Sequence, residues 1–122
     1  MKFAKTVFLI AGVYGLIVLV PQFFLERRIG EDTPPAITHP EFFYGFICVA
    51  VAWQVLFLIL SRDPIRYRPM MIPAMLEKIG FPVAVLILYF QGRVAPVIFI
   101  PASLDLVLLV LFIAAYRKTA AS

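Results

Sequence analysis

The sequence predicts an all-α fold, an integral membrane four-helix bundle with both termini cytoplasmic. The 122 residues are 63% hydrophobic with a mean hydropathy of +0.99, far above the roughly half-apolar composition of soluble domains. The apolar residues gather in four spans of about 20 residues, a length that crosses a hydrocarbon core about 30 Å thick. Four spans and short loops use nearly all of the chain, so we expect a single transmembrane domain, residues 1–122, with no room for a soluble catalytic domain.

The first predicted helix covers residues 3–24. It follows Lys2 and Lys5 and so resembles a signal peptide, but its apolar run exceeds the usual length of about 7–15 residues and lacks a small-x-small site at its end. We therefore expect a retained helix. Gly12 and Gly15 place small residues on one face, which would let a neighbouring helix approach closely; ordinary membrane glycines are the alternative.

One sizeable loop is expected next, over residues 22–40, because this stretch is polar and rich in turn-forming residues. Thr38 and Glu41 have the spacing of a capping box, which places the start of the next helix at about His39. His39 is the only histidine, so we expect a solvated residue at the helix start rather than a metal or haem ligand.

The second predicted helix covers residues 39–60 and is apolar except for Gln54. Trp53 lies beside Gln54 near mid-membrane, away from the interfacial belt that tryptophan usually occupies, so we expect it to pack against other helices. A basic loop follows, and its cations are candidate contacts for lipid head groups: Arg62, Arg66 and Arg68.

The third and fourth predicted helices, residues 70–91 and 94–116, carry charges inside apolar spans. Glu77 and Lys78 lie in the third helix, and Asp105 lies near the middle of the fourth. A charged side chain near the centre of a membrane helix costs roughly 2.5–3.5 kcal/mol, so these groups should face protein or water rather than lipid.

Antiparallel helices bring these groups to a similar depth. Counting residues from each connecting turn places Gln54 opposite Glu77, and Asp105 within a few residues of Lys78. In a structural role, Lys78 pairs with Asp105, and Glu77 bonds to Gln54 or extends to the cytoplasmic interface. In a functional role, intramembrane ionisable residues mark a pocket or pathway. The catalytic candidates are Glu77, Asp105 and Lys78, and the ligand-binding candidates are Gln54, Glu77, Trp53, Asp105 and Tyr14.

Several classes of function are excluded. No nucleophile has a histidine near it, and glycine-rich phosphate loops and metal-ligand spacings are absent from the sequence, so we expect no metal, no cofactor and neither covalent hydrolysis nor nucleotide chemistry. The net charge of +4 lies beside apolar spans, which favours anionic lipid over nucleic acid as a partner.

The orientation follows from counting cations on each side of the predicted membrane. Seven lie on the side of both termini and three on the other, so the positive-inside rule predicts a multi-pass protein of the cell inner membrane with cytoplasmic termini. The first side carries Lys2, Lys5, Arg62, Arg66, Arg68, Arg117 and Lys118, and the second carries Arg27, Arg28 and Arg93.

The stretches YGF, AWQ and SRDPIRYRPMMIPAMLEKIGFPVAV, together with IAGVYGLIVLVPQFFLE and ITHPEF, cover most of the chain. They resemble a group of small uncharacterised bacterial four-helix membrane proteins that are distantly similar in layout to DoxX-like proteins. The resemblance implies a four-helix membrane fold. It implies no activity and assigns no functional residue.

We expect a non-enzymatic protein, an accessory subunit or a binder of a lipid or other apolar ligand. The alternative is an intramembrane acid/base enzyme or proton-coupled carrier that uses Glu77, Asp105 and Lys78. The expected partners are membrane lipids and, beyond them, a second copy of the chain or a larger membrane complex. A closed, dry helix core would favour the first expectation, and a cavity that reaches the charged residues would favour the alternative.

Overall fold

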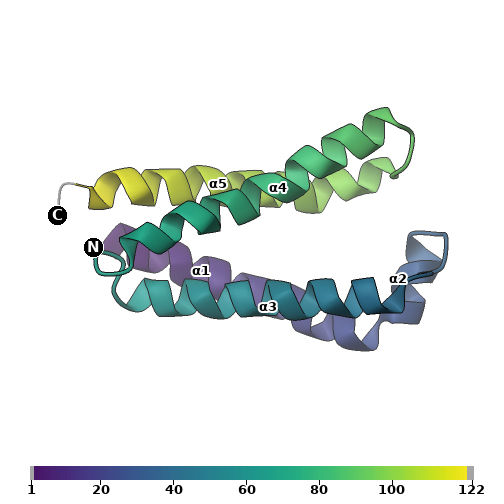
Figure 1. Cartoon of the computed structure of the whole chain (residues 1–122), viewed down its shortest axis with the longest axis horizontal. Helices are drawn as coiled ribbons and strands as arrows, with labels where there is room; N and C mark the ends of the chain where they lie inside the picture. Colours follow the sequence, from purple (N-terminus) through teal and green to yellow (C-terminus); the bar gives the residue numbers. More distant parts are fainter. Residues whose placement is uncertain (1, 121–122) are drawn as a thin grey trace.

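The computed structural model describes residues 2–120, and all regular elements in this range are helical (Figure 1). The prediction of an all-α fold is confirmed. Four helical segments are long and apolar enough to cross a membrane, and each of their ends lies within three residues of the predicted one. The elements are α1 (Lys2–Leu19), η1 (Val20–Phe24), α2 (Glu26–Asp32), α3 (Pro40–Arg62), η2 (Arg68–Met70), α4 (Met71–Phe90), η3 (Pro96–Ile98) and α5 (Phe99–Thr119).

The four long helices form two pairs, α1 with α3 and α4 with α5. Glycine explains the close packing of the first pair. A Cβ atom at Gly12 would lie 2.7 Å from Cδ2 of Leu58, and one at Gly15 would overlap the side-chain amide of Gln54. The predicted small-residue face of the first helix is thus confirmed, and it packs against α3.

The hydrophobic core is concentrated at one end of the molecule. Phe8 of α1, Phe57 of α3 and Phe112 of α5 meet there, with ring centroids 4.4 Å apart for Phe8 and Phe112 and 5.1 Å apart for Phe57 and Phe112. All four helices contribute to this core, whereas a second, smaller cluster joins only α1 and α3. The two helix pairs are therefore held together at the end that carries both termini, and they diverge toward the end that carries α2 (Figure 1).

The loop prediction for residues 22–40 was wrong in part, because η1 extends to Phe24 and α2 forms within the stretch. Two ion pairs at i,i+4 spacing stabilise α2: Arg27 Nε lies 3.4 Å from Glu31 Oε1, and Arg28 Nε lies 3.2 Å from Asp32 Oδ2. Apart from Leu25, the non-helical part of the stretch is therefore confined to residues 33–39.

The predicted capping box was also wrong. Helix α3 begins at Pro40, its N-cap is His39, and no side chain caps it. Proline at the first helical position moves the start one residue later than predicted, so Glu41 occupies the second position rather than the third. Its carboxylate oxygen Oε1 instead lies 3.2 Å from Nδ1 of His39.

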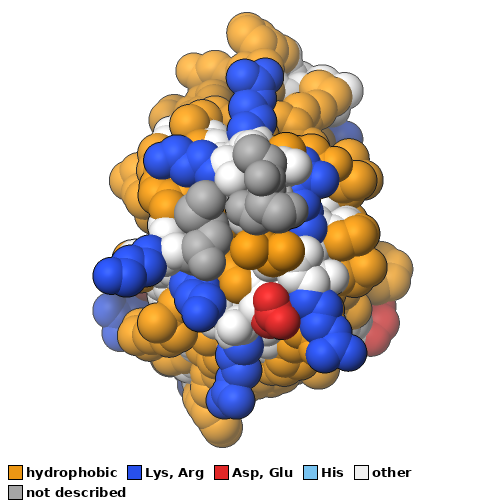
Figure 2. All heavy atoms as spheres, turned by 90° about the vertical axis from the view of Figure 1, so that its left-hand side faces the viewer, with side chains coloured by type: hydrophobic (Ala, Val, Ile, Leu, Met, Phe, Trp, Pro, Cys, Tyr) orange, Lys and Arg blue, Asp and Glu red, His pale blue; other side chains and the backbone are white. Residues whose placement is uncertain are grey.

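The end of the molecule that carries both termini is strongly basic, as its end-on surface shows (Figure 2). Most cations there are exposed, but Arg68 is engaged with the end of α5. Its Nε and Nη2 atoms donate hydrogen bonds to the carbonyl oxygen of Tyr116 at 3.1 and 2.9 Å, and Nε also donates to Oγ1 of Thr119 at 3.1 Å. Arg68 thus ties the link between α3 and α4 to α5.

Candidate functional site

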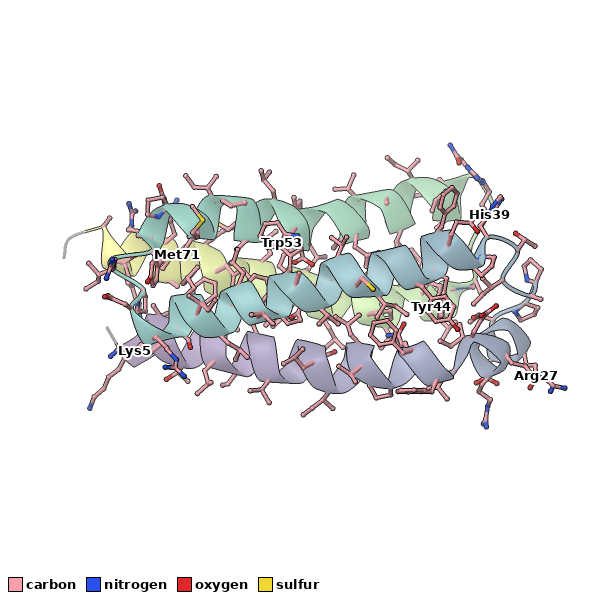
Figure 3. The ribbon with its side chains drawn as sticks, turned by 60° about the horizontal axis from the view of Figure 1, so that its bottom comes forward. Lys5, Arg27, His39, Tyr44, Trp53 and Met71 are labelled. Atoms are coloured by element: carbon pink, nitrogen blue, oxygen red, sulfur yellow. The ribbon has the colours of Figure 1, made fainter. Side chains whose placement is uncertain are left out.

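A cavity of about 480 Å³ lies where the two helix pairs begin to diverge, bordered by all four long helices. Trp53, which lines the cavity, lies about midway between the end of the molecule that carries Lys5 and Met71 and the end that carries Arg27 and His39 (Figure 3). The cavity is therefore near the middle of the long axis. The cavity is lined by Tyr14, Gly15, Val18, Leu19, Gln22, Phe46, Val49, Ala50, Trp53, Gln54, Glu77, Lys78, Phe81, Pro101 and Asp105.

A three-residue ion cluster forms the charged part of this lining. Lys78 Nζ lies 3.3 Å from Glu77 Oε2 and 3.6 Å from Asp105 Oδ1. The predicted pair between Lys78 and Asp105 is confirmed. The Lys78 side chain is only 7% exposed, whereas those of Glu77 and Asp105 are 23% and 22% exposed, so the carboxylates face the cavity more openly than the ammonium does.

Of the two arrangements predicted for Glu77, the hydrogen bond to Gln54 does not form. Gln54 Nε2 instead donates to the carbonyl oxygen of Ala50, one turn earlier in α3, at 2.8 Å. The Gln54 amide is buried against Gly15, where the missing Cβ leaves room for it.

Two buried oxygen atoms in the lining accept no hydrogen bond, Gln54 Oε1 and Glu77 Oε2. Glu77 Oε2 is at ion-pair distance from Lys78 Nζ, but the two atoms do not form a hydrogen bond. A buried acceptor without a donor costs roughly 1–3 kcal/mol, so both oxygens are unsatisfied polar atoms next to the cavity.

All five ligand-binding candidates from the sequence line this one cavity, and so do the three catalytic candidates. Their roles stay predictions. Sequence reasoning missed the apolar residues of the cavity wall. Helical spacing offered a signal for them, since most wall residues lie three, four or seven positions from a candidate residue on the same helix. Val18 follows Tyr14 by four, Phe46 and Val49 precede Trp53 by seven and four, Phe81 follows Lys78 by three, and Pro101 precedes Asp105 by four.

The candidate lipid-contacting residues lie outside the cavity. Arg62 and Arg66 are exposed at the basic end, while Arg68 is half-buried and bound to α5. Their contact with lipid head groups stays a prediction.

A second cavity, of about 620 Å³, lies between α2 and the start of α3, where Tyr44 donates a hydrogen bond to Glu26 Oε1 at 3.0 Å. None of the candidate residues lines it. In residues 2–120, no three His, Cys, Asp or Glu side chains are close enough together to hold a metal ion.

Comparison with protein-family models, curated proteins and solved structures finds no match to this chain. The resemblance to DoxX-like proteins therefore stays a prediction. Arguments about function depend on the chain's own residues, above all on the apolar cavity and its charged lining.

Proposed function

We propose that this chain is a multi-pass protein of the cell inner membrane, with both termini cytoplasmic, that binds a small apolar ligand in the cavity between its helix pairs. Four apolar helices of spanning length support the membrane location. The basic end face supports the orientation (Figure 2). Seven of the eleven Lys and Arg residues lie near the termini or in the link between α3 and α4, which are at this end.

The cavity is the observation that carries the binding proposal. Its volume of about 480 Å³ falls within the roughly 300–1,000 Å³ typical of small-molecule sites. Apolar and aromatic side chains dominate its lining, and a few polar groups converge on it, the usual composition of such a site. Phe46 and Val49 are 57% and 60% exposed, so the wall they form is open to the surroundings, and a ligand could enter from the side.

The cavity favours binding over a purely structural role. A closed, dry core would suit an accessory subunit whose charges only hold helices together, but here the charged residues line open space. An accessory role in a larger complex stays a prediction.

A proton-coupled carrier or acid/base enzyme is the second candidate, and the ion cluster favours it. Glu77, Lys78 and Asp105 all line the cavity, where a bound molecule would touch groups that can exchange protons. In proteoliposomes, a carrier would move protons when a ligand gradient is imposed, and Glu77→Gln would abolish that movement while binding persists. A simple binder would move no protons in either form.

Binding can be tested through Trp53, the only tryptophan in the chain and part of the cavity wall. A bromoalkane quenches tryptophan fluorescence on contact, so in neutral detergent it should quench Trp53 saturably, and the unbrominated alkane should reverse the effect. Val49→Phe adds bulk to the cavity wall and should weaken the quenching at least about fivefold.

Val55→Phe is the matched control, because Val55 lies on the same helix, is 45% exposed and does not line the cavity. Quenching that is linear in bromoalkane concentration, or that falls equally in both variants, would overturn the binding proposal.

A further inference from the structure

The charged groups that line the cavity do not balance. Lys78 brings one positive charge, and Glu77 and Asp105 bring one negative charge each when ionised, all within 3.6 Å of the same ammonium. In residues 2–120, no other Lys or Arg lines the cavity. In a region of low dielectric constant an uncompensated negative charge is costly, and an entering cation would neutralise it.

Two buried oxygen atoms beside the charged groups lack a hydrogen-bond donor. Gln54 is 2% exposed, and its Oε1 atom has no donor, as is also true of Glu77 Oε2. Each side-chain amide in the lining donates one hydrogen bond within its own helical segment, Gln54 Nε2 to Ala50 and Gln22 Nε2 to Val18. Tyr14 supplies the one hydroxyl group in the lining.

The lysine ammonium is equally occupied. It lies between the two carboxylates and 5.3 Å from the centre of the Phe57 ring, so its positive charge is directed at groups within the protein. An anionic head group would have to compete with Glu77 and Asp105 for this single cation. A cationic head group would meet two carboxylates that share this single cation.

Aromatic side chains complete the surroundings. Phe46, Trp53 and Phe81 line the same cavity, and their ring faces attract cations as well as apolar chains. The lining therefore combines a negatively charged polar part with an aromatic and aliphatic wall.

We propose that the ligand of this cavity is a cationic amphiphile, an apolar molecule with an ammonium head group that binds beside Glu77, Asp105 and Gln54. This proposal rests on the proposed function, since it names the class of ligand for the same cavity.

The test compares three probes that share one bromoalkyl chain and differ only in the head: a trimethylammonium, an alcohol and a carboxylate. Quenching of Trp53 is titrated for each in neutral detergent, and the residual quenching in Val49→Phe is subtracted as contact outside the cavity. We expect saturable quenching with an affinity order of ammonium, alcohol and carboxylate, and at least about a tenfold difference between the first and the last.

Charge variants separate a head-group effect from general hydrophobicity. Glu77→Gln and Asp105→Asn each remove one negative charge from the cavity and should reduce the preference for ammonium over carboxylate by at least about fivefold. Glu41→Gln, an exposed carboxylate at the start of α3 and outside the cavity, should leave the preference unchanged.

The outcomes distinguish the two proposals. Equal affinities for the three heads, or a preference for the carboxylate, would overturn the cationic ligand and leave the binding function standing. The absence of saturable quenching by any probe would overturn both. The affinities of the three head groups for the unmodified chain test the cationic ligand even where a charge variant fails to fold.

Discussion

Gly15 determines, at the scale of a single residue, where the Gln54 amide of the cavity lining lies. It has no Cβ, and the space this leaves is filled by the side-chain amide of Gln54. Gln54 can therefore be almost completely buried between α1 and α3 while its amide bonds to Ala50. A larger residue at position 15 would push the amide out of this place.

Two glycines allow a matched test of this account. Gly15→Ala should lower the free energy of unfolding by about 1–3 kcal/mol, because the new methyl group overlaps the Gln54 amide. Gly80→Ala, in α4, meets nothing within 4 Å and should be neutral or stabilising by up to about 1 kcal/mol, since alanine favours the helix. The measurement is unfolding of both variants in mixed micelles by titration with a denaturing detergent.

Equal stabilities of the two alanine variants would show that Gln54 moves aside at no cost. In that case Gly15 would not determine the position of the Gln54 amide.

Helix α4 is anchored differently at its two ends, at the scale of the element. Its far end stops in a tight turn, where Gly92 has a φ of 70° and Arg93 N donates to the carbonyl oxygen of Leu88 at 2.9 Å. Its near end is joined by Arg68 to the last turn of α5, where carbonyl groups lack partners within the helix. The guanidinium also lies 3.7 Å from the centre of the Tyr116 ring.

Arg68→Ala should therefore lower the free energy of unfolding by about 1–3 kcal/mol, through the loss of charged donors to Tyr116 and Thr119. Arg66→Ala is the matched control, because Arg66 is exposed on the same link and should change stability by less than about 0.5 kcal/mol. Unfolding in mixed micelles measures both variants. If Arg66→Ala lowers the free energy of unfolding as much as Arg68→Ala does, the positive charge of the link between α3 and α4 matters for stability and the hydrogen bonds of Arg68 do not explain the effect.

The elements were predictable where one strong signal governs them. Apolar length alone places the four long helices, and antiparallel counting places Lys78 beside Asp105. The prediction failed where weak local signals compete, as in the stretch before α3, where i,i+4 ion pairs accompany α2 and proline displaces the capping box. The cavity walls were not predictable, because they depend on how far the two helix pairs diverge.

The whole molecule is electrically asymmetric along its length. The end face that carries the termini is strongly basic (Figure 2), whereas the opposite end, where Arg27 and His39 lie (Figure 3), holds both acids and cations in α2 and at the start of α3: Glu26, Arg27, Arg28, Glu31, Asp32 and Glu41. Such asymmetry is the pattern by which membrane proteins are oriented during insertion.

The proposed orientation predicts the reactivity of introduced cysteines. In a Cys48→Ala background, a cysteine at Asp32 should react with an impermeant thiol reagent added to intact cells, and one at Ala120 should react only after the membrane is opened, because both positions are exposed in the fold but lie at opposite ends. The reverse pattern would mean that the termini are outside the cytoplasm. Reaction of both positions in intact cells would contradict a chain that crosses the membrane four times.

The contacts among the rings of Phe8, Phe57 and Phe112 lie at the end where the two helix pairs are held together, so a rotation of one pair against the other would be centred near these rings. About 16 residues separate Phe112 from Pro96 at the far end, a lever of roughly 24 Å at about 1.5 Å per residue. Turning the α4 and α5 pair by roughly 5° about these rings would move that end by about 2 Å, which is more than a methylene group adds to the length of an alkyl chain. Exchanging one ring for a smaller side chain should thus change the distance between the pairs at the cavity, although none of the three rings lines the cavity.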